Sequence, residues 1–391
     1  INNDEVIQVK TDSITFKKTN DNYKAYLSEE LEGWKLEDFK ELISAKQYNK
    51  EQLTLNFRDN TIKKLNNKVP YKKNCIVMGY AGNGKSHFVK TELIPKILED
   101  NESYKVLTPS HDSANEYRRD KLQVRVIQGY SFMNQVPEQQ HIIIDEIGMV
   151  SSHDWLVIIK CILLGKYVYC FGDFNQLSPV KSSKITRNFI ESLFEYQVWF
   201  KENFRNNYST DYYKKLITTQ DSEYLYNEVR DKSCEEWSEG CLLVSYRNTV
   251  RHKHNKEICD KLSVPYILKE DKTLVISPQV PVGVPIICKS NVLSGMHIWN
   301  KFTFKIKENR GNKIIITDGI LEYNLEYQTI KRYFDYAYCR TLYSIQGKSI
   351  EKIKFCKEDI KMLGNEEAYT FISRFKEKVD TTNKIKYELT F

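Results

Sequence analysis

The residues from Gly79 to Ser86, GYAGNGKS, constrain the fold of this chain more than any other stretch. The apolar run Cys75–Met78 precedes them, and together they predict a strand, a glycine loop and a helix in that order. In such a loop, backbone N–H groups surround a phosphate at the positive end of a helix. Lys85 is expected to reach the β and γ phosphates of ATP, and Ser86 to ligate Mg²⁺. The remaining nucleotide-binding positions of the loop are Gly79, Gly82, Asn83 and Gly84.

Strand and helix patterns alternate after this loop. The predicted strands are 105–108, 124–127, 141–145 and 167–171, and the predicted helices are 112–121 and 155–164. This alternation is typical of an α/β fold in which helices cover both faces of a parallel sheet. The continuous apolar run Ile142–Ile144 is expected in the interior of that sheet.

Two carboxylates follow the strand that contains this apolar run. Ligands of open α/β sheets bind at the carboxyl ends of the strands, which is where Asp145 and Glu146 lie. Asp145 is expected to hold Mg²⁺ through the water shell of the ion, and Glu146 to polarise the water that attacks ATP. At the end of the next strand, Gln176 is suited to sensing the γ-phosphate or the attacking water.

Composition sets further limits. A chain of 391 residues is long enough for two or three domains. Its 59 basic and 52 acidic residues give a net charge of +7, which is compatible with a polyanionic partner. No segment resembles a signal peptide or a membrane span, and the nine cysteines are scattered without metal-ligand spacing. We therefore expect an intracellular, reducing location (cytoplasm, nucleus or viral replication site) and no membrane partner; the start at Ile1 suggests a fragment or processed product.

Two longer runs carry a family resemblance. DEIGMV (145–150) and GDFNQLSPV (172–180) resemble motifs II and III of superfamily 1 helicases, in the RecD-like and Pif-like branch. Further segments resemble later or intervening motifs of this family in the expected order: 106–110, 127–132, 202–205, 243–248, 282–291, 341–349 and 369–374. The resemblance implies two RecA-like motor domains, at 61–205 and 206–391, after an N-terminal extension at 1–60. It also implies a small SH3-like β insertion at about 290–330, where the strand-rich run 302–330 lies.

The resemblance also assigns roles to single residues. Arg205 and Arg374 would each bring a guanidinium group to the γ-phosphate. They lie far along the chain from Lys85, so two domains would have to close on one nucleotide. The implied nucleic-acid contacts, through hydroxyls, an amide and aromatic rings, are Thr108, Ser110, Tyr130, Phe174, Asn248, Thr341, Tyr343 and Ser344.

The chain departs from the family pattern at several places, one of which is the segment 127–132, where the usual Thr-Ile-His is absent. Tyr343, Ser344 and Ile345 stand where motif V usually carries His-Lys-Ser, so a basic strand contact is absent there. The glutamine that reads adenine has two candidates, Gln52 and Asn60, which leaves base selectivity open.

The function that these features favour is an ATP-dependent DNA helicase or single-strand translocase in replication, repair or recombination. By resemblance its polarity would be 5′-to-3′. Its cofactors would be ATP and Mg²⁺, and its partner single-stranded or forked DNA, with RNA as an alternative and a larger replication protein or complex around it. A viral superfamily 1 RNA helicase with RNA triphosphatase activity is a second hypothesis, since it shares the loop, the acid pair and the glutamine. A P-loop ATPase that acts as a scaffold and not as a motor is a third.

Overall fold

The computed structural model describes residues 62–177, 193–233, 237–377, 379, 384 and 387–391, together with the backbone of two strands near the N-terminus. These strands, β1 (Val6–Lys10) and β2 (Ser13–Phe16), form an antiparallel hairpin in a unit that spans residues 1–55. Residues 56–391 form a second compact unit, which carries every predicted catalytic and phosphate-binding residue. The adenine-reading candidates, Gln52 and Asn60, and the motif III residues 178–180 lie outside the described residues.

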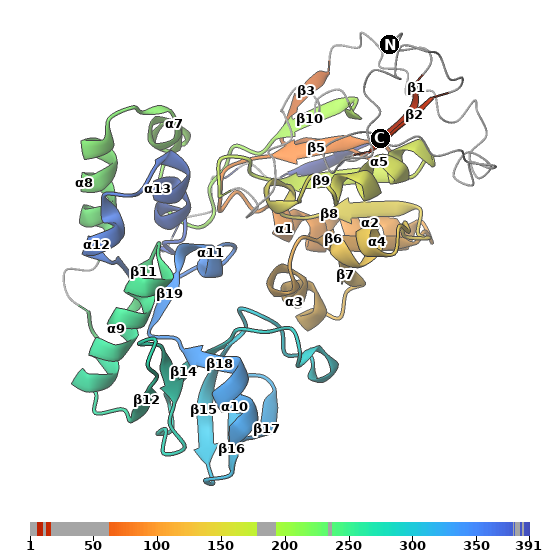
Figure 1. Cartoon of the computed structure of the whole chain (residues 1–391). Coiled ribbons are helices and arrows are strands. Elements are labelled where there is room, and N and C mark those ends of the chain that lie inside the picture. Colours follow the sequence, from red (N-terminus) through yellow and green to blue (C-terminus); the bar gives the residue numbers. More distant parts are fainter. Residues whose placement is uncertain are drawn as a thin grey trace, which may run out of the picture. The chain divides into compact units, whose positions relative to one another are not determined.

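A parallel seven-stranded sheet forms the first part of the larger unit (Figure 1). Its strands, in spatial order, are β3 (Lys63–Asn66), β10 (Tyr196–Trp199), β5 (Cys75–Met78), β9 (Tyr167–Gly172), β8 (His141–Ile144), β6 (Tyr104–Thr108) and β7 (Val124–Val126). Every neighbouring pair in this sheet is parallel. The predicted parallel α/β sheet is therefore confirmed.

Helices cover both faces of this sheet, because successive side chains of a strand point to opposite faces. Ile142 and Ile144 of β8 pack in one apolar cluster and Ile143 packs in another. The first cluster contains residues of α4 (Gln128–Phe132) and α5 (Trp155–Leu163). The second contains residues of α1 (Lys85–Phe88), the π-helical turn Val89–Leu93, α2 (Ile94–Glu99) and α3 (His111–Arg119). The predicted run Ile142–Ile144 thus lies inside a sheet that is buried on both sides, as expected.

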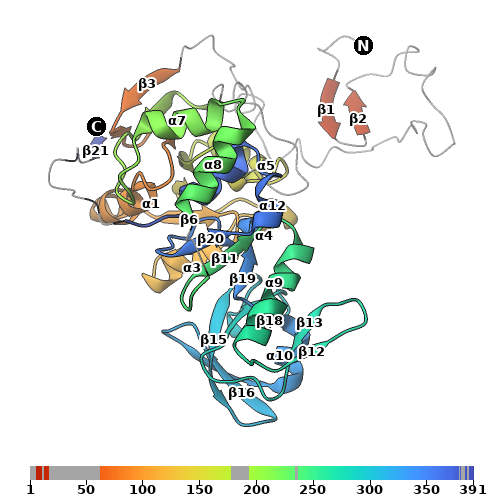
Figure 2. The same ribbon diagram turned by 90° about the vertical axis from the view of Figure 1, so that its left-hand side faces the viewer.

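A second, smaller parallel sheet contains three strands in the order β19 (Cys339–Thr341), β11 (Leu242–Ser245) and β20 (Ile353–Phe355). The helices of this part are α7 (Thr210–Thr218), α8 (Ser222–Lys232), α9 (Asn248–Lys261), α11 (Leu342–Ile345), α12 (Lys357–Ile360) and α13 (Asn365–Ile372). Figure 2 shows α7, α8, α9 and α12, and Figure 1 shows α11 and α13. Tyr369 and Phe371 of α13 share an apolar cluster with Tyr80 of the phosphate loop and Leu177. The two parallel sheets are therefore joined by a common core next to the loop.

A β module, residues 285–336, interrupts the second part. Its five antiparallel strands lie in the order β17 (Glu322–Glu326), β16 (Lys313–Thr317), β15 (Thr303–Asn309), β14 (Pro285–Cys288) and β18 (Phe334–Tyr336). Helix α10 (Tyr327–Tyr333) joins β17 to β18, and the hairpin β12 (Tyr266–Leu268) and β13 (Leu274–Ile276) precedes the module. A β insertion is present where 302–330 predicts one, whereas its likeness to an SH3 domain remains a prediction.

The end of the chain returns to the first part of the unit. β21 (Glu388–Thr390) pairs in parallel with β4 (Lys68–Pro70), just before the first strand of the phosphate-loop pattern. The motif resemblance places these last residues in the second motor domain, whereas the strand pairing brings them into contact with the first part. The domain boundaries at residues 60 and 205 remain predictions.

None of the helices in the described ranges is long and apolar enough to cross a membrane. The eight cysteines that the structure describes are buried. Burial raises the pKa of the Cys161 thiol to about 12, which is the behaviour of a small apolar core residue.

Trp299 connects the β module to the first part of the unit. Its ring stacks on His111 at 4.8 Å between centroids, and the Arg118 guanidinium lies 4.4 Å from the Trp299 ring centroid. His111 and Arg118 both belong to α3, and Arg119 of the same helix lies 3.3 Å from Asp318 of the module. The module therefore packs on α3 through one aromatic side chain and one ion pair.

We expect Trp299→Ala to lower the free energy of unfolding by about 3–5 kcal/mol, because the buried indole contributes to the module core and to the contact with α3. Denaturant unfolding followed by circular dichroism measures the loss. Hydrogen exchange of the α3 amides should also become faster. Ile320→Ala is the control, since Ile320 of the same module is 66% exposed and its loss should change stability by less than about 0.5 kcal/mol. Equal effects of the two substitutions would contradict this role of Trp299.

Candidate nucleotide site between the two parallel sheets

The phosphate loop connects β5 to α1 with the predicted geometry. Gly82 and Gly84 have φ angles of 86° and 72°, in the left-handed region that favours glycine, and α1 begins at Lys85. A Cβ atom on Gly82 would lie 2.7 Å from the Cβ of Arg205 and 2.7 Å from Asn203 Oδ1. The Phe204 N–H also donates to the Gly82 carbonyl at 2.8 Å. The loop is therefore in contact with the segment that carries Arg205, and only glycine leaves room for that contact.

Lys85 lies folded over the loop that precedes it. Its Nζ donates to the carbonyls of Gly79 at 2.7 Å and Tyr80 at 2.9 Å. Burial lowers the pKa of Lys85, and the carboxylates of Asp173, Glu146 and Asp145 oppose this shift. Asn83 is also buried, and its side chain donates to the Phe200 carbonyl at 2.6 Å. A desolvated ammonium group at the start of a helix is well placed for a phosphate.

Asp145 and Ser86, the predicted magnesium ligands, lie together. Ser86 Oγ donates to Asp145 Oδ2 at 2.7 Å, and the Glu146 N–H donates to Asp145 Oδ1 at 2.9 Å. Mg²⁺ prefers hard oxygen ligands and is usually held by one or two side chains together with water and substrate phosphates. This donor set fits magnesium. Over the part of the chain that the structure describes, no group of three His, Cys, Asp or Glu residues forms an all-protein metal site.

Glu146 has an unusual backbone for a residue with a side chain. Its φ and ψ angles are 56° and 47°, in the left-handed region, at the start of the 3-10 turn Ile147–Met149. Such backbone strain occurs preferentially at functional sites. Burial, together with the charge of Asp145, raises the pKa of Glu146 to about 7. The carboxyl group is thus held in a desolvated place beside the predicted metal ligands.

The two predicted arginines reach this site from different elements. Arg374 follows α13, is 1% exposed, and donates through Nη2 to Gln176 Oε1 at 3.3 Å. Arg205 donates through Nη1 to the Ser373 carbonyl at 3.0 Å. Burial, with a smaller contribution from Arg205, lowers the pKa of Arg374 to about 10. The structure therefore brings Gln176, Arg205 and Arg374 together beside the loop.

These groups line one cleft of about 710 Å³. Among the predicted catalytic, nucleotide-binding and metal residues, those that line it are Gly82, Asn83, Gly84, Lys85, Ser86, Asp145, Glu146, Gln176, Arg205 and Arg374. Gly79 does not line the cleft and lies instead against the Phe200 carbonyl. The volume is in the range of small-molecule and cofactor sites. The cleft can therefore accept a nucleotide between the first and second parallel sheets.

The Tyr369 hydroxyl, which the sequence did not single out, joins α13 to Asp173 and to the phosphate loop. Tyr369 of α13 donates to the Asp173 carboxylate, and its oxygen accepts the Ala81 N–H at 2.8 Å. Asp173 also accepts from Gln176 Nε2 at 3.4 Å. Tyr369 and Asp173 lie inside segments that resemble motifs VI and III, but no spacing along the sequence indicates that they meet.

Further charged groups that the sequence did not single out line the cleft, among them Lys348, Asp112 and Glu116. Lys348 lies 3.2 Å from Asp112 of α3, and burial together with Arg340 lowers the pKa of Lys348 to about 8. Glu116 of α3 also lines the cleft, and burial raises its pKa. The signal that could have identified Lys348 is its place directly after Gln346 and Gly347 in the segment that resembles motif V.

The predicted strand contacts of the first part are only partly accessible. Thr108 is fully buried and donates to the Ser110 carbonyl at 3.0 Å, so the prediction of a direct strand contact by its hydroxyl is not supported. Tyr130 is 8% exposed, and the Arg125 guanidinium lies 4.9 Å from its ring centroid, which argues against base stacking. Ser110 caps α3 by accepting the Ser113 N–H at 3.1 Å and is partly exposed, as is Phe174.

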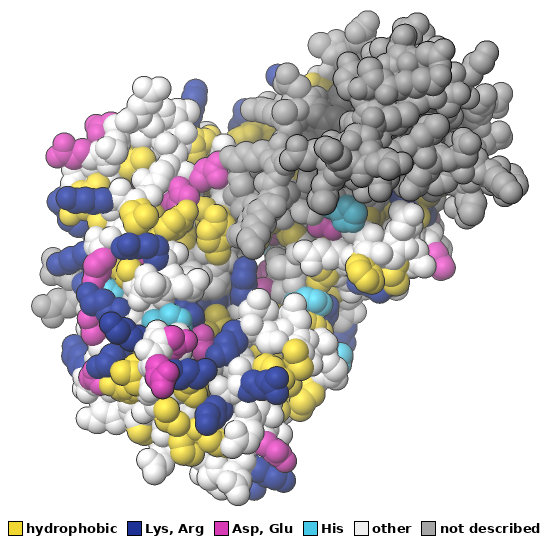
Figure 3. Space-filling view, in the orientation of Figure 1, with side chains coloured by type: hydrophobic (Ala, Val, Ile, Leu, Met, Phe, Trp, Pro, Cys, Tyr) yellow, Lys and Arg dark blue, Asp and Glu magenta, His cyan; other side chains and the backbone are white. Residues whose placement is uncertain are grey.

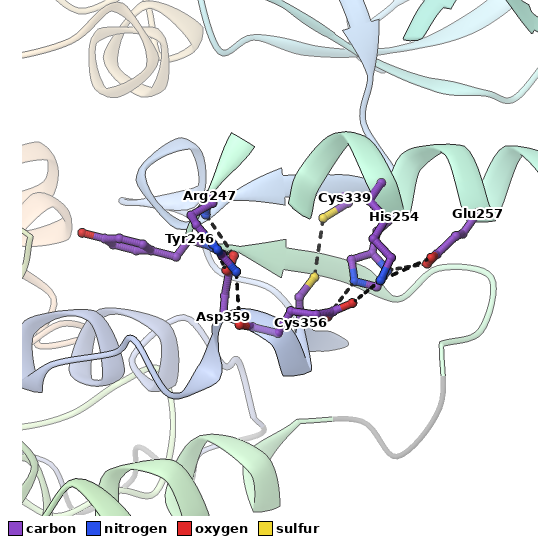
Figure 4. Close-up of polar contacts among 9 residues, drawn as sticks. Tyr246, Arg247, His254, Glu257, Cys339, Cys356 and Asp359 are labelled. Carbon is purple, nitrogen blue, oxygen red and sulfur yellow. Dashed lines mark hydrogen bonds and ion pairs between the residues drawn. The ribbon is translucent and has the colours of Figure 1, made fainter. Parts of the chain in front are cut away.

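In the second part, Asn248 is exposed at the start of α9. Asp359 fixes the turn that precedes it, because the fully buried carboxylate accepts the N–H groups of Tyr246 at 2.7 Å and Arg247 at 2.9 Å (Figure 4). Arg247 Nε donates to the same carboxylate at 2.6 Å. Asn248 is thus presented on a firmly held turn.

The other predicted contacts of the second part lie at the end of β19 and directly after it. Thr341 and Tyr343 are half-buried, so part of each side chain is accessible. Ser344 is buried and donates to the Thr341 carbonyl at 2.7 Å, which leaves its hydroxyl engaged within the protein. None of the eight predicted strand contacts lines the nucleotide cleft.

Comparison with known proteins gives a consistent picture. A sequence profile described as an AAA domain matches residues 68–217, which include the phosphate loop and the acid pair. A search of curated protein sequences finds no match.

Solved structures of Pif1 helicases are similar to this chain. A structure of two coordinating Pif1 helicases at forked double-stranded DNA has a TM-score of 0.56 and 17% identity, covering 78% of this chain and 86% of the other. The structure of Bacteroides Pif1 with ADP-AlF3 and single-stranded DNA has a TM-score of 0.54 and 16% identity, covering 81% of this chain and 88% of the other. The structure of Candida albicans Pif1 has a TM-score of 0.50 and 16% identity, covering 78% of this chain and 89% of the other. The chain therefore has the fold of these Pif1 helicases, as the resemblance of its motifs predicts.

Proposed function

We propose that the chain is an ATP-driven helicase or translocase on single-stranded DNA. The observation that carries this proposal is the cleft itself, which Lys85 and Asp145 line from one side and Arg374 from the other. A nucleotide bound there would contact both parallel sheets at once. Binding and hydrolysis of ATP would thereby open and close the two parts of the unit.

Residues of the first part would hold the nucleotide. The loop amides and Lys85 would bind the phosphates, and Ser86 with Asp145 would hold the magnesium ion. When bound, magnesium neutralises charge on the phosphate oxygens. Glu146 would hold the attacking water and accept its proton, for which a carboxylate with a pKa of about 7 is well suited.

Residues of the second part would complete the site on closure. Arg374 and Gln176 already lie in contact, so a small movement would bring the guanidinium group to the γ-phosphate. An arginine in this role is worth about 10³- to 10⁵-fold in the rate of phosphoryl transfer. Hydrolysis would therefore depend on the closed state, which is the basis of a motor.

The proposed partner is single-stranded or forked DNA. Pif1 structures with similar folds contain single-stranded or forked DNA, which supports this choice. Lys and Arg side chains are frequent over the part of the surface that carries α9 and the β module, with Asp and Glu side chains between them (Figure 3), and basic groups attract the phosphate backbone. The accessible candidates for strand contact are Ser110, Phe174, Asn248, Thr341 and Tyr343. A 5′-to-3′ polarity and a place in a larger replication protein or complex are further parts of this proposal.

Stimulation of ATP hydrolysis by oligonucleotides tests the motor class. A motor should hydrolyse ATP at least about 10-fold faster with saturating single-stranded DNA, because strand binding favours closure of the arginine side of the cleft. Duplex DNA without tails is the control. Little stimulation by any nucleic acid would support the scaffold hypothesis. The RNA helicase and triphosphatase hypothesis would be supported if only RNA stimulated hydrolysis and the chain also removed the γ-phosphate from a 5′-triphosphate RNA end.

A further inference from the structure

Tyr117 of α3 contacts the predicted magnesium ligand directly. Its hydroxyl donates to Asp145 Oδ2 at 2.6 Å, and the residue is 1% exposed. The ring packs in the apolar cluster between the first sheet and helices α1 to α3. A phenol with an ordinary pKa near 10 is protonated at neutral pH, so this group acts as a hydrogen-bond donor. The proposed mechanism gives Tyr117 no role.

Three donors hold the Asp145 carboxylate. Oδ2 accepts from Ser86 and Tyr117, and Oδ1 accepts from the Glu146 N–H. Ser86 is itself a predicted magnesium ligand, and Glu146 is the adjacent residue in the chain. Tyr117 is therefore the one of these three donors that comes from outside the phosphate loop and the acid pair. Partners of this kind orient a ligating carboxylate, and their loss commonly costs about 10- to 100-fold in metal affinity.

The helix that carries Tyr117 is held at several points. Ser110 caps its first turn, and Lys348 of the second part lies 3.2 Å from Asp112. His111 and Arg118 enclose Trp299 of the β module. The hydroxyl of Tyr117 is thus placed by contacts that extend to the second sheet and to the β module.

We propose that Tyr117 is a positioning residue for the magnesium site, which orients the Asp145 carboxylate through one buried hydrogen bond from α3. This inference rests on the proposed function, because it takes Asp145 as a magnesium ligand. The N-cap of the same helix is Ser110, a predicted strand contact that lies about 10 Å away along the helix axis. A shift of α3 on strand binding would therefore move the donor that orients the metal ligand.

Tyr117→Phe tests the proposal, because it removes the hydroxyl and keeps the buried ring. The affinity for a fluorescent ATP analogue is measured without DNA at increasing Mg²⁺ concentration. The value to compare is the magnesium midpoint, which is the Mg²⁺ concentration at which half of the magnesium-dependent gain in affinity is reached. We expect this concentration to rise about 10-fold or more, while affinity in excess EDTA stays unchanged. Turnover should approach that of the wild type at saturating Mg²⁺, since the substitution leaves Glu146 and Arg374 in place.

Tyr169→Phe is the matched control. Tyr169 of β9 is buried in the same apolar cluster, and its hydroxyl accepts the Lys72 N–H at 2.8 Å, away from Asp145. An unchanged magnesium midpoint in Tyr117→Phe, or an equal shift in Tyr169→Phe, would overturn the role of Tyr117 alone. A wild-type chain whose nucleotide affinity does not depend on Mg²⁺ would instead overturn the metal assignment of Ser86 and Asp145 in the proposed function.

Discussion

Replacing Glu146 by glutamine is expected to lower the rate of ATP hydrolysis by about 10²- to 10⁴-fold, with ATP affinity close to that of the wild type. Glutamine has nearly the same size and shape as glutamate but cannot accept the proton of the attacking water. The Asp145–Ser86 contact and the loop amides do not depend on the Glu146 carboxylate, so the nucleotide should still bind. Steady-state hydrolysis and equilibrium nucleotide binding separate the two effects.

Glu99→Gln is the control for this substitution. Glu99 lies at the end of α2, its side chain is 71% exposed, and it is not among the cleft residues. We expect it to change neither turnover nor nucleotide binding. A rate of ATP hydrolysis by Glu146→Gln equal to that of the wild type would refute the assignment of Glu146 as the base.

The second large effect is expected at Arg374. Arg374→Ala should reduce strand-stimulated ATP turnover by about 10³- to 10⁵-fold, because the transition state would lose a guanidinium group in a desolvated cleft. Nucleotide binding should change much less, since Lys85 and the loop hold the phosphates from the other side. Measured nucleotide affinity also shows that the variant is folded, which matters for a residue that is 1% exposed.

Arg230→Ala is the matched control. Arg230 lies on α8, is exposed, and bonds to the adjacent Asp231 at 2.9 Å. Its removal should leave turnover unchanged, because an exposed ion pair contributes little and no cleft residue contacts it. An Arg374→Ala variant with the turnover number of the wild type would rule out the finger role.

Much of this site was predictable because its parts are local in sequence. The phosphate loop requires glycines at fixed positions, and Gly82 and Gly84 take the left-handed angles that the pattern implies. The run Ile142–Ile144 predicts a strand that is buried on both faces, and the acids that follow it necessarily lie at the carboxyl edge of the sheet. Spacing and side-chain chemistry are sufficient for these predictions.

Contacts between distant segments were not predictable from the sequence in this way. Tyr117 and Asp145 are brought together by the packing of α3 on β6 and β7, and tyrosine in a helix carries no signal of its partner. The same holds for Tyr369 with Asp173 and for the pairing of β21 with β4. The burial of Thr108 and Tyr130 does not follow from the sequence, because family motifs give residue positions but not the exposure of each side chain.

Unwinding of partial duplexes with a single-stranded tail tests the central claim most directly. The account predicts ATP-dependent separation of a DNA duplex that carries a 5′ tail, with little separation of 3′-tailed or blunt duplexes and none by Glu146→Gln. Matched RNA duplexes distinguish the DNA helicase from the RNA helicase alternative. A chain that hydrolyses ATP but separates no tailed duplex and does not move along a single strand would contradict the proposal that this cleft drives a motor.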